Sequence, residues 1–547
     1  MGPRPRISPR PWRSAATLVT AVALPVAGIL VLAPAAQPGT PPGLGAFYAQ
    51  RIAWRACGPE LARELKAAGV TPPQEDTSRF ECGTLKVPKI YAVPDRGTFE
   101  LAMLRVPATG ALGEQRERRA LVLNFGGPGE SGVEGLAAFA DGLGRLNTVY
   151  DLVGHDPRGV GRSAPVRCGE PAEADWDELD HTPDTTPEAV TIARAEELVN
   201  ETCGREAGDV LPWVGTVDSA RDLDVMRAAL DVEKLDYLGF SYGTKLGANY
   251  LAKYPGRAGR FVLDGVMDVT KDPRETALAD ARAFQLALDS FVADCTADNS
   301  GQEEGSCPLG GSAREAGRTL NQLFIDLDSN TMATKAGDLD QDTFVQGIIG
   351  ALYSKEQGWP ALREAFTALA DGDGAPLVRL AGGGSGRTSR AALSGASRSA
   401  SRAPDDATAN ADDANRAISC RDESRRYAPR DYTRAVAGFR EASPLFGDAM
   451  AAELLTCTGW PVAGENTANR VRASGAPPAL LVSTTRDPAT PYAGAAALAG
   501  VLANGSRVLT HVGDGHTAYL AGDTCVDSAV EDYLLKGRLP AKGKRCN

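Results

Sequence analysis

Short apolar runs alternate with longer helical patterns through most of the chain. Runs that are nearly continuous in apolar residues are typical of strands buried on both faces of a sheet. Such runs or shorter strand-like segments occur at residues 120–125, 149–153, 235–240, 260–263, 479–483 and 507–512. Residues 80–93 and 97–106 alternate apolar and polar positions and predict antiparallel opening strands. Amphipathic helical patterns lie between the runs, as at 217–230 and 529–535. This alternation predicts an α/β fold around a mostly parallel sheet.

Between residues 270 and 474 the pattern is helical and contains no convincing buried strand. Within it, residues 381–416 are rich in Gly, Ser, Arg, Ala and Asp, a composition that predicts a flexible loop. A helical block inserted after the strand at 260–263 stands where a lid would cover a sheet edge. We therefore expect a core formed by residues 53–269 and 475–547, with an inserted helical lid or cap at 270–474.

The first 36 residues have the pattern of a signal peptide. A basic start is followed by an apolar run at 15–33, and small residues at 33–36 suit a signal peptidase. The alternative is an uncleaved membrane anchor, against which Pro25 and the small residues argue. Residues 37–52 are expected as a flexible leader that begins with a Pro- and Gly-rich stretch. The sequence predicts a secreted protein with no stable membrane association after cleavage.

Composition and charge narrow the class of protein. The 547 residues are 43% hydrophobic and 23% charged, which is ordinary for a globular protein with a substantial core. The net charge of −12 argues against a general nucleic-acid binder, which would present a basic face. It weakly favours substrates that carry positive charge.

The even number of cysteines supports export. Ten cysteines without a C-x-x-C pair, behind a signal peptide, predict disulfides rather than zinc or redox sites. Sequence alone does not fix their connectivity. Pairing in sequence order would close local loops: Cys57–Cys82, Cys168–Cys203, Cys295–Cys307, Cys420–Cys457 and Cys525–Cys546.

The run at 235–240 leads into a motif with chemical meaning. Residues 239–243 read GFSYG, and 244–254 continue as a helix. This strand–turn–helix context matches the G-x-S-x-G elbow, in which glycines allow the strand and helix to approach and the serine projects above the sheet. An ordinary Gly/Ser turn is the alternative. The context favours Ser241 as a nucleophile.

A serine hydroxyl needs an adjacent base, and the chain has only four histidines. His516 follows the last strand run in a Gly-rich turn, in the order Ser…Asp…His. His511 lies within that strand, and His155 and His181 precede the serine. The sequence therefore favours His516 as the general base.

The third member must be a carboxylate that orients the imidazole. Asp487 follows the strand at 479–483, at the strand end where α/β sheets form sites. Asp264, at the end of the preceding strand, is the competitor. Chain order and proximity to His516 favour Asp487.

An oxyanion hole requires two backbone N–H groups. One is expected from Tyr242, the residue after the nucleophile, and the other from the Gly-rich turn at 126–129, for which we favour Gly127. No metal or organic cofactor is implied by this set of residues.

Taken together, these motifs resemble a known family. The segments are NFGGPG at 124–129, DPRGVGRS at 156–163, the Ser241 elbow, DPATP at 487–491 and GHT at 515–517. They look like the α/β-hydrolase family of prolyl aminopeptidases, most closely its secreted bacterial tripeptidyl-aminopeptidase branch. The resemblance covers residue 53 to the C-terminus. Phe125 stands where the family often has His, and Glu130 where a small residue is common; both departures bear on substrate choice.

The resemblance implies an α/β-hydrolase fold with a helical cap and a serine exopeptidase that releases short peptides or single residues from free N-termini. Such an enzyme must hold a protonated α-amine, for which Glu130, Asp422 and Glu423 are candidates, against the alternative that each is a solvated surface charge. An esterase or lipase-like enzyme on the same triad is the nearest rival, and a silent binding protein on this fold is a more distant one. The sequence does not indicate the oligomeric state.

Overall fold

The computed structural model describes residues 42–67, 77–110, 119–169, 182–297, 307–383 and 410–547, with the single residues 2 and 179. The predicted signal peptide therefore lies outside the described residues, apart from residue 2. No helix within the described part of the chain has the length and apolar character to cross a membrane.

The core is a mixed sheet whose strands run in the order β1-β2-β3-β5-β4-β6-β7-β10-β11-β12. The pairs β1/β2, β2/β3 and β3/β5 are antiparallel, and the other pairs are parallel. The strands are β1 (Arg55–Ala56), β2 (Glu81–Pro88), β3 (Thr98–Val106), β4 (Ala120–Asn124), β5 (Asp151–His155), β6 (Leu235–Phe240), β7 (Ala258–Asp264), β10 (Leu480–Arg486), β11 (Arg507–Asp514) and β12 (Arg545–Cys546). The α/β class with a mostly parallel sheet is thus confirmed. All residues of β4 and β6 are buried, as their continuous apolar runs predict.

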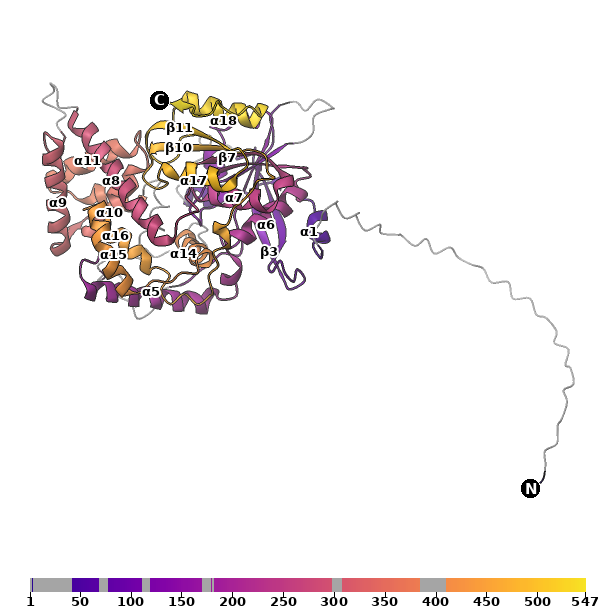
Figure 1. Ribbon diagram of the computed structural model, residues 1–547, viewed down its shortest axis with the longest axis horizontal. Helices are drawn as coiled ribbons and strands as arrows, with labels where there is room; N and C mark the ends of the chain where they lie inside the picture. The colour runs from indigo at the N-terminus through magenta and orange to yellow at the C-terminus, as the bar shows by residue number, and fades with distance from the viewer. Residues whose placement is uncertain are drawn as a thin grey trace.

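Helices cover both faces of the sheet (Figure 1). One face packs in a hydrophobic cluster with α1, α6, α7 and α17, and the other with α2, α3, α4 and α18. The bounds are α1 (Gly45–Ala49), α2 (Pro59–Ala67), α3 (Gly132–Phe139), α4 (Gly144–Asn147), α6 (Thr216–Ala229), α7 (Tyr242–Lys253), α17 (Ala493–Leu502) and α18 (Thr524–Lys536).

A helical cap with its own hydrophobic cluster lies beside the sheet (Figure 1). It contains α8 (Pro273–Ala297), α9 (Ala313–Ser329), the hairpin β8 (Met332–Thr334) and β9 (Gly337–Leu339), α10 (Gln341–Leu352), α11 (Gly358–Ala370), α12 (Ala375–Gly383), α15 (Pro429–Ala442), α16 (Gly447–Ala452) and the short 3-10 helix η5 (Glu453–Leu455). The hairpin apart, this insertion is helical, as the sequence pattern indicates.

Three segments differ from the sequence expectations. Residues 53–269 are expected to belong to the core, but α5 (Thr186–Ala207) contributes Ala189 and Ile192 to the cap cluster. α14 (Ala411–Asp422), inside the inserted block, packs instead in the core cluster through Ala414 and Ile418. The expected flexible loop 381–416 lies mainly outside the described residues, but its ends belong to α12 and α14.

Part of the expected flexible leader is packed onto the core. Tyr48 in α1 is 1% exposed, and its hydroxyl donates to Asp224 Oδ2 at 2.5 Å. The expectation of a flexible leader is therefore wrong for this part, because the Pro/Gly-rich stretch is followed by an aromatic residue, Tyr48, that packs into the core. Residues 37–41 lie outside the described part.

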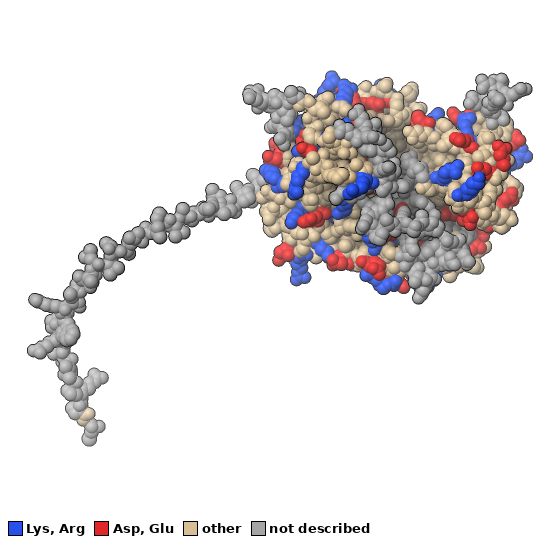
Figure 2. All heavy atoms as spheres, turned by 180° about the vertical axis from the view of Figure 1, so that it is seen from behind, with Lys and Arg blue, Asp and Glu red and all other residues tan. Residues whose placement is uncertain are grey.

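The five disulfides pair in sequence order, as expected, and no described cysteine is free. On the face drawn in Figure 2, Lys and Arg side chains lie among Asp and Glu side chains. The negative net charge is therefore not gathered into one patch on that face.

Candidate active site

Ser241 lies at the sharp turn between β6 and α7, with φ 52° and ψ −120°. Its N–H donates to the carbonyl of Asp264 at 2.9 Å, which holds this unusual conformation. A Cβ on Gly239 would lie 2.6 Å from the carbonyl oxygen of Gly243, so the glycines of the motif permit the close strand–helix contact. Ser241 lines a cavity of about 1150 Å³ between core and cap.

His516 and Asp487 come together at the ends of neighbouring strands. His516 Nδ1 lies 2.9 Å from Asp487 Oδ1 and 3.1 Å from Oδ2, and His516 lines the same cavity as Ser241. Asp487 also accepts from the N–H of Thr490 at 2.8 Å and from its hydroxyl at 2.8 Å. A carboxylate fixed in this way holds the imidazole with Nε2 free to accept the serine proton.

The electrostatic surroundings make His516 a stronger base. Burial lowers its pKa, but the charge and hydrogen bond of Asp487, together with the charge of Asp264, outweigh burial and raise the pKa above the ordinary 6.5.

Asp264 has a different role from Asp487. It is fully buried, and its oxygens accept from the N–H groups of Ala518 and Tyr519 at 3.0 and 2.8 Å. Burial raises its pKa to about 6. Asp264 therefore anchors the segment that follows His516, while Asp487 orients the imidazole.

The two oxyanion donors expected from sequence come from elements that border the cavity of Ser241: the start of α7 and the Gly-rich turn after β4. The N–H of Tyr242 is the first of α7 and has no partner within the helix. Gly127 lines the cavity with φ 95°, and a Cβ there would lie 2.8 Å from the N of Gly129. α14 supports this turn, because Asn415 Nδ2 donates to the carbonyl of Pro128 at 2.9 Å.

The three carboxylates proposed for the amine differ in their placement. Glu130 and Glu423 line the cavity. Asp422 does not: its oxygens accept from the N–H of Thr216 at 2.9 Å and pair with Lys245 Nζ at 3.0 Å. Asp422 is thus a buried residue that links α14 to the core. The prediction that it binds the substrate amine is wrong, because Thr216 and Lys245 already occupy its carboxylate oxygens.

Two carboxylates that line the cavity are not among the residues predicted from the sequence. Asp280 on α8 and Glu453 in η5 line the cavity, and the carboxylate of neither has a hydrogen bond or ion pair to a described residue. Burial, and to a smaller extent the negative charge of Asp487, raises the pKa of Asp280. Burial, and to a smaller extent the charge of Asp280, raises the pKa of Glu453. The available signal was a charged residue inside the apolar stripe of α8, between the buried Ala277 and Ala281.

The other described histidines, His155 and His511, do not line the cavity. His155 at the end of β5 is buried, which lowers its pKa to about 4. His511 in β11 lies between Thr484 and Asp523. His181 lies outside the described residues.

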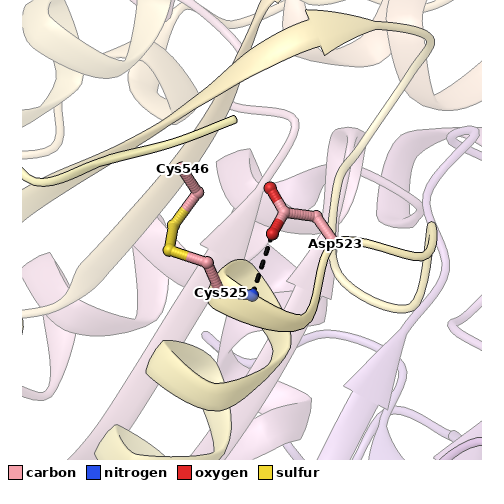
Figure 3. Close-up of side chains that lie close together, drawn as sticks. All are labelled: Asp523, Cys525 and Cys546. Atoms are coloured by element: carbon pink, nitrogen blue, oxygen red, sulfur yellow. Dashed lines mark hydrogen bonds between the residues drawn. A yellow bond between two sulfur atoms is a disulfide. The ribbon is translucent and has the colours of Figure 1, made fainter.

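One group within the described residues has ligand-type atoms close enough for a metal ion: Asp523, Cys525 and Cys546. Figure 3 shows that the two cysteines form a disulfide and that Asp523 points at the N–H of Cys525. That carboxylate caps α18, with Oδ1 at 2.8 Å from the Cys525 nitrogen. Disulfide sulfur is not a thiolate ligand, so this group is a structural clamp.

A Ser–His–Asp set at the ends of β6, β11 and β10, with N–H donors beside the serine, defines a serine hydrolase on an α/β-hydrolase fold. Comparison with known proteins agrees. The model of the family described as "TAP-like protein" matches residues 443–546.

Curated relatives extend this match over most of the chain. Serine protease Hip1 of Mycobacterium tuberculosis is 37% identical over 85% of this chain and 87% of its own. Carboxylesterase B of the same species is 33% identical over 96% and 95%. Tripeptidyl aminopeptidase of Streptomyces lividans is 31% identical over 85% and 83%. The chain belongs to this TAP-like family of α/β-hydrolases.

Proposed function

We propose that the protein is a secreted serine exopeptidase that releases short peptides, tripeptides foremost, or single residues from substrates with a free N-terminus. Ser241 attacks the scissile carbonyl while His516 accepts its proton, and the N–H groups of Tyr242 and Gly127 stabilise the oxyanion. His516 then returns the proton to the leaving amine. Water, activated by the same histidine, releases the acyl group from Ser241.

The observation that carries the proposal is a pair of cap carboxylates, Asp280 and Glu453, that line the same cavity as Ser241 and His516. Asp280 and Glu453 line the cavity from the cap, their carboxylates have no partner among the described residues, and their raised pKa values reflect the cost of ionising them there. A substrate ammonium group would relieve that cost and form charge-assisted hydrogen bonds. Lys271, the cation whose charge acts on Asp280, is itself paired with Asp268. The pair therefore suits an exchangeable cation from the substrate.

Other observations support parts of the proposal. One relative carries the name tripeptidyl aminopeptidase and another serine protease. Five disulfides favour an oxidising compartment and hence export. The second candidate is an esterase, which the relative named carboxylesterase B favours and which the triad alone does not distinguish.

The test is hydrolysis of mono-, di- and tripeptidyl p-nitroanilides with free and acetylated N-termini, beside a p-nitrophenyl ester, with Ser241→Ala as the blank. We expect cleavage of anilides to require the free amine. Equal cleavage of acetylated copies would contradict the exopeptidase, and cleavage of the ester alone would establish the esterase.

Variants locate the amine site. Asp280→Asn is expected to raise KM for free-amine substrates about 10-fold or more, because a charged hydrogen bond contributes roughly 1.5–3 kcal/mol. Asp289→Asn is the matched control: it removes the same charge from the same helix at an exposed position. Equal KM values for the two variants would place the amine elsewhere, with Glu423 as the next residue to test.

A further inference from the structure

An aromatic wall borders the oxyanion hole. It consists of Phe125, Phe139 and Phe240, all of which line the cavity that holds Ser241. The ring of Phe125 stacks between the other two, with centroids 5.4 Å from Phe139 and 5.9 Å from Phe240. The three rings form one continuous apolar surface.

The wall is built into the catalytic elements. Phe125 directly precedes the Gly-rich turn that bears Gly127, and Phe240 directly precedes Ser241. Gly135 of α3 fixes the position of the Phe125 ring, since a Cβ there would lie 2.3 Å from it. The surface therefore has a defined place relative to the reacting carbonyl.

Part of the aromatic wall is exposed and is not covered by other side chains, as Phe139 shows. Phe139 is 49% exposed, although its ring belongs to an aromatic stack, and it lines the cavity that holds Ser241. The mechanism assigned to the triad makes no use of these rings. An exposed aromatic surface inside a reaction cavity is suited to bury an apolar group of the substrate.

The geometry of the reaction indicates which group this is. The scissile carbon has three substituents: its oxygen, the leaving nitrogen and the chain of the residue that supplies the carbonyl. The oxygen faces the N–H donors. The leaving nitrogen must face His516, whose ring packs edge-on against that of Tyr353 from the cap, with 5.2 Å between the ring centroids. The remaining substituent belongs to the acyl group, which becomes attached to Ser241, and the wall adjoins Ser241 through Phe240 and the oxyanion turn through Phe125.

We propose that Phe125, Phe139 and Phe240 form the specificity pocket for the residue that supplies the scissile carbonyl, and that they select a large apolar or aromatic side chain there. The inference rests on the proposed function in that the substrate is taken to be a peptide. It does not depend on recognition of the free amine.

The test uses free-amine tripeptidyl p-nitroanilides that differ only in the residue before the anilide: Ala, Leu, Phe or Glu. A parallel series of p-nitrophenyl esters, acetate against 3-phenylpropionate, varies the same acyl position without an amine. We expect kcat/KM to favour Phe and Leu over Ala by about 10-fold or more, the discrimination typical of an apolar pocket. Failure of the amine requirement with retained acyl selectivity would overturn only the exopeptidase.

Variants assign the selectivity to the wall. Phe139→Ala is expected to reduce the Phe-to-Ala ratio of kcat/KM about 10-fold, and Gly135→Ala to reduce it as well by displacing the Phe125 ring. Phe139→Leu, which keeps an apolar side chain, separates loss of the ring from loss of fold. Ile325→Ala on α9, at an exposed position outside the cavity lining, is the control.

Two results would overturn the inference. One is an unchanged ratio in folded Phe139→Ala and Gly135→Ala. The other is a selectivity that follows the residue after the scissile bond, measured with internally quenched peptides, instead of the residue before it.

Discussion

Gly126 links the oxyanion turn to the nucleophile, and replacing it tests the geometry of the site. Its φ is 104°, and its N–H donates to Asn124 Oδ1 at 3.2 Å. A Cβ at this position would lie 3.0 Å from both the carbonyl oxygen of Phe240 and Cβ of Ser241. The Gly126→Ala substitution would therefore place a methyl group on a residue with an unfavourable positive φ and bring it into close contact with Phe240 and Ser241.

The magnitude follows from these two effects. A non-glycine residue at this φ costs about 1–3 kcal/mol, which we expect as a loss in the free energy of unfolding. Relief of the contact displaces either Ser241 or the turn that bears Gly127. Since a misplacement of about 1 Å can cost roughly 100-fold in rate, and the shift needed is smaller, we expect kcat to fall about 10- to 100-fold.

The assay combines anilide or ester turnover, fluorophosphonate labelling of Ser241, and denaturant unfolding. The control is Gly500→Ala on α17, at an exposed helical position where a Cβ would meet nothing within 4 Å. That change is expected to leave turnover unaltered and to add about 0.5–1 kcal/mol of stability. A Gly126→Ala enzyme with kcat within about threefold of the wild type would refute the reasoning.

Two further predictions concern the histidine and a disulfide. The general base must be neutral, so kcat/KM is lost as the pH falls through the raised pKa of His516; we expect the midpoint above 6.5 and a shift to lower pH in Asp264→Asn, which removes one of the charges that raise it. A pH profile with a wild-type midpoint below 6.5, or an unshifted variant, would contradict this. Replacing both Cys420 and Cys457 by Ala removes a cross-link over 37 residues and should cost about 3–4 kcal/mol in chain entropy, measured by guanidinium unfolding under conditions that keep the other disulfides; a loss below about 1 kcal/mol would count against the entropic account.

Local pattern was sufficient for the features that depend on neighbours in the chain. Continuous apolar runs identify β4 and β6, and the glycines around Ser241 identify the elbow, because strand burial and tight turns leave direct marks on residue type. The chain order Ser241, Asp487, His516 identifies the triad, because each residue follows a parallel strand of the sheet and the carboxyl ends of parallel strands lie at the same edge. Pairing of cysteines in sequence order also succeeds, because each disulfide closes a loop of 12 to 37 residues.

Only the tertiary structure decided the roles of the carboxylates. Asp422 and Glu423 are adjacent in sequence, yet the end of α14 turns one into a buried pair with Lys245 and the other into the cavity. Asp280 and Glu453 lie far apart in the chain and come close only because α8 and η5 pack together within the cap. Whether a carboxylate is a strut, a surface charge or a ligand depends on burial and on the partners that occupy its oxygens, and those are properties of the packed structure that residue type does not record.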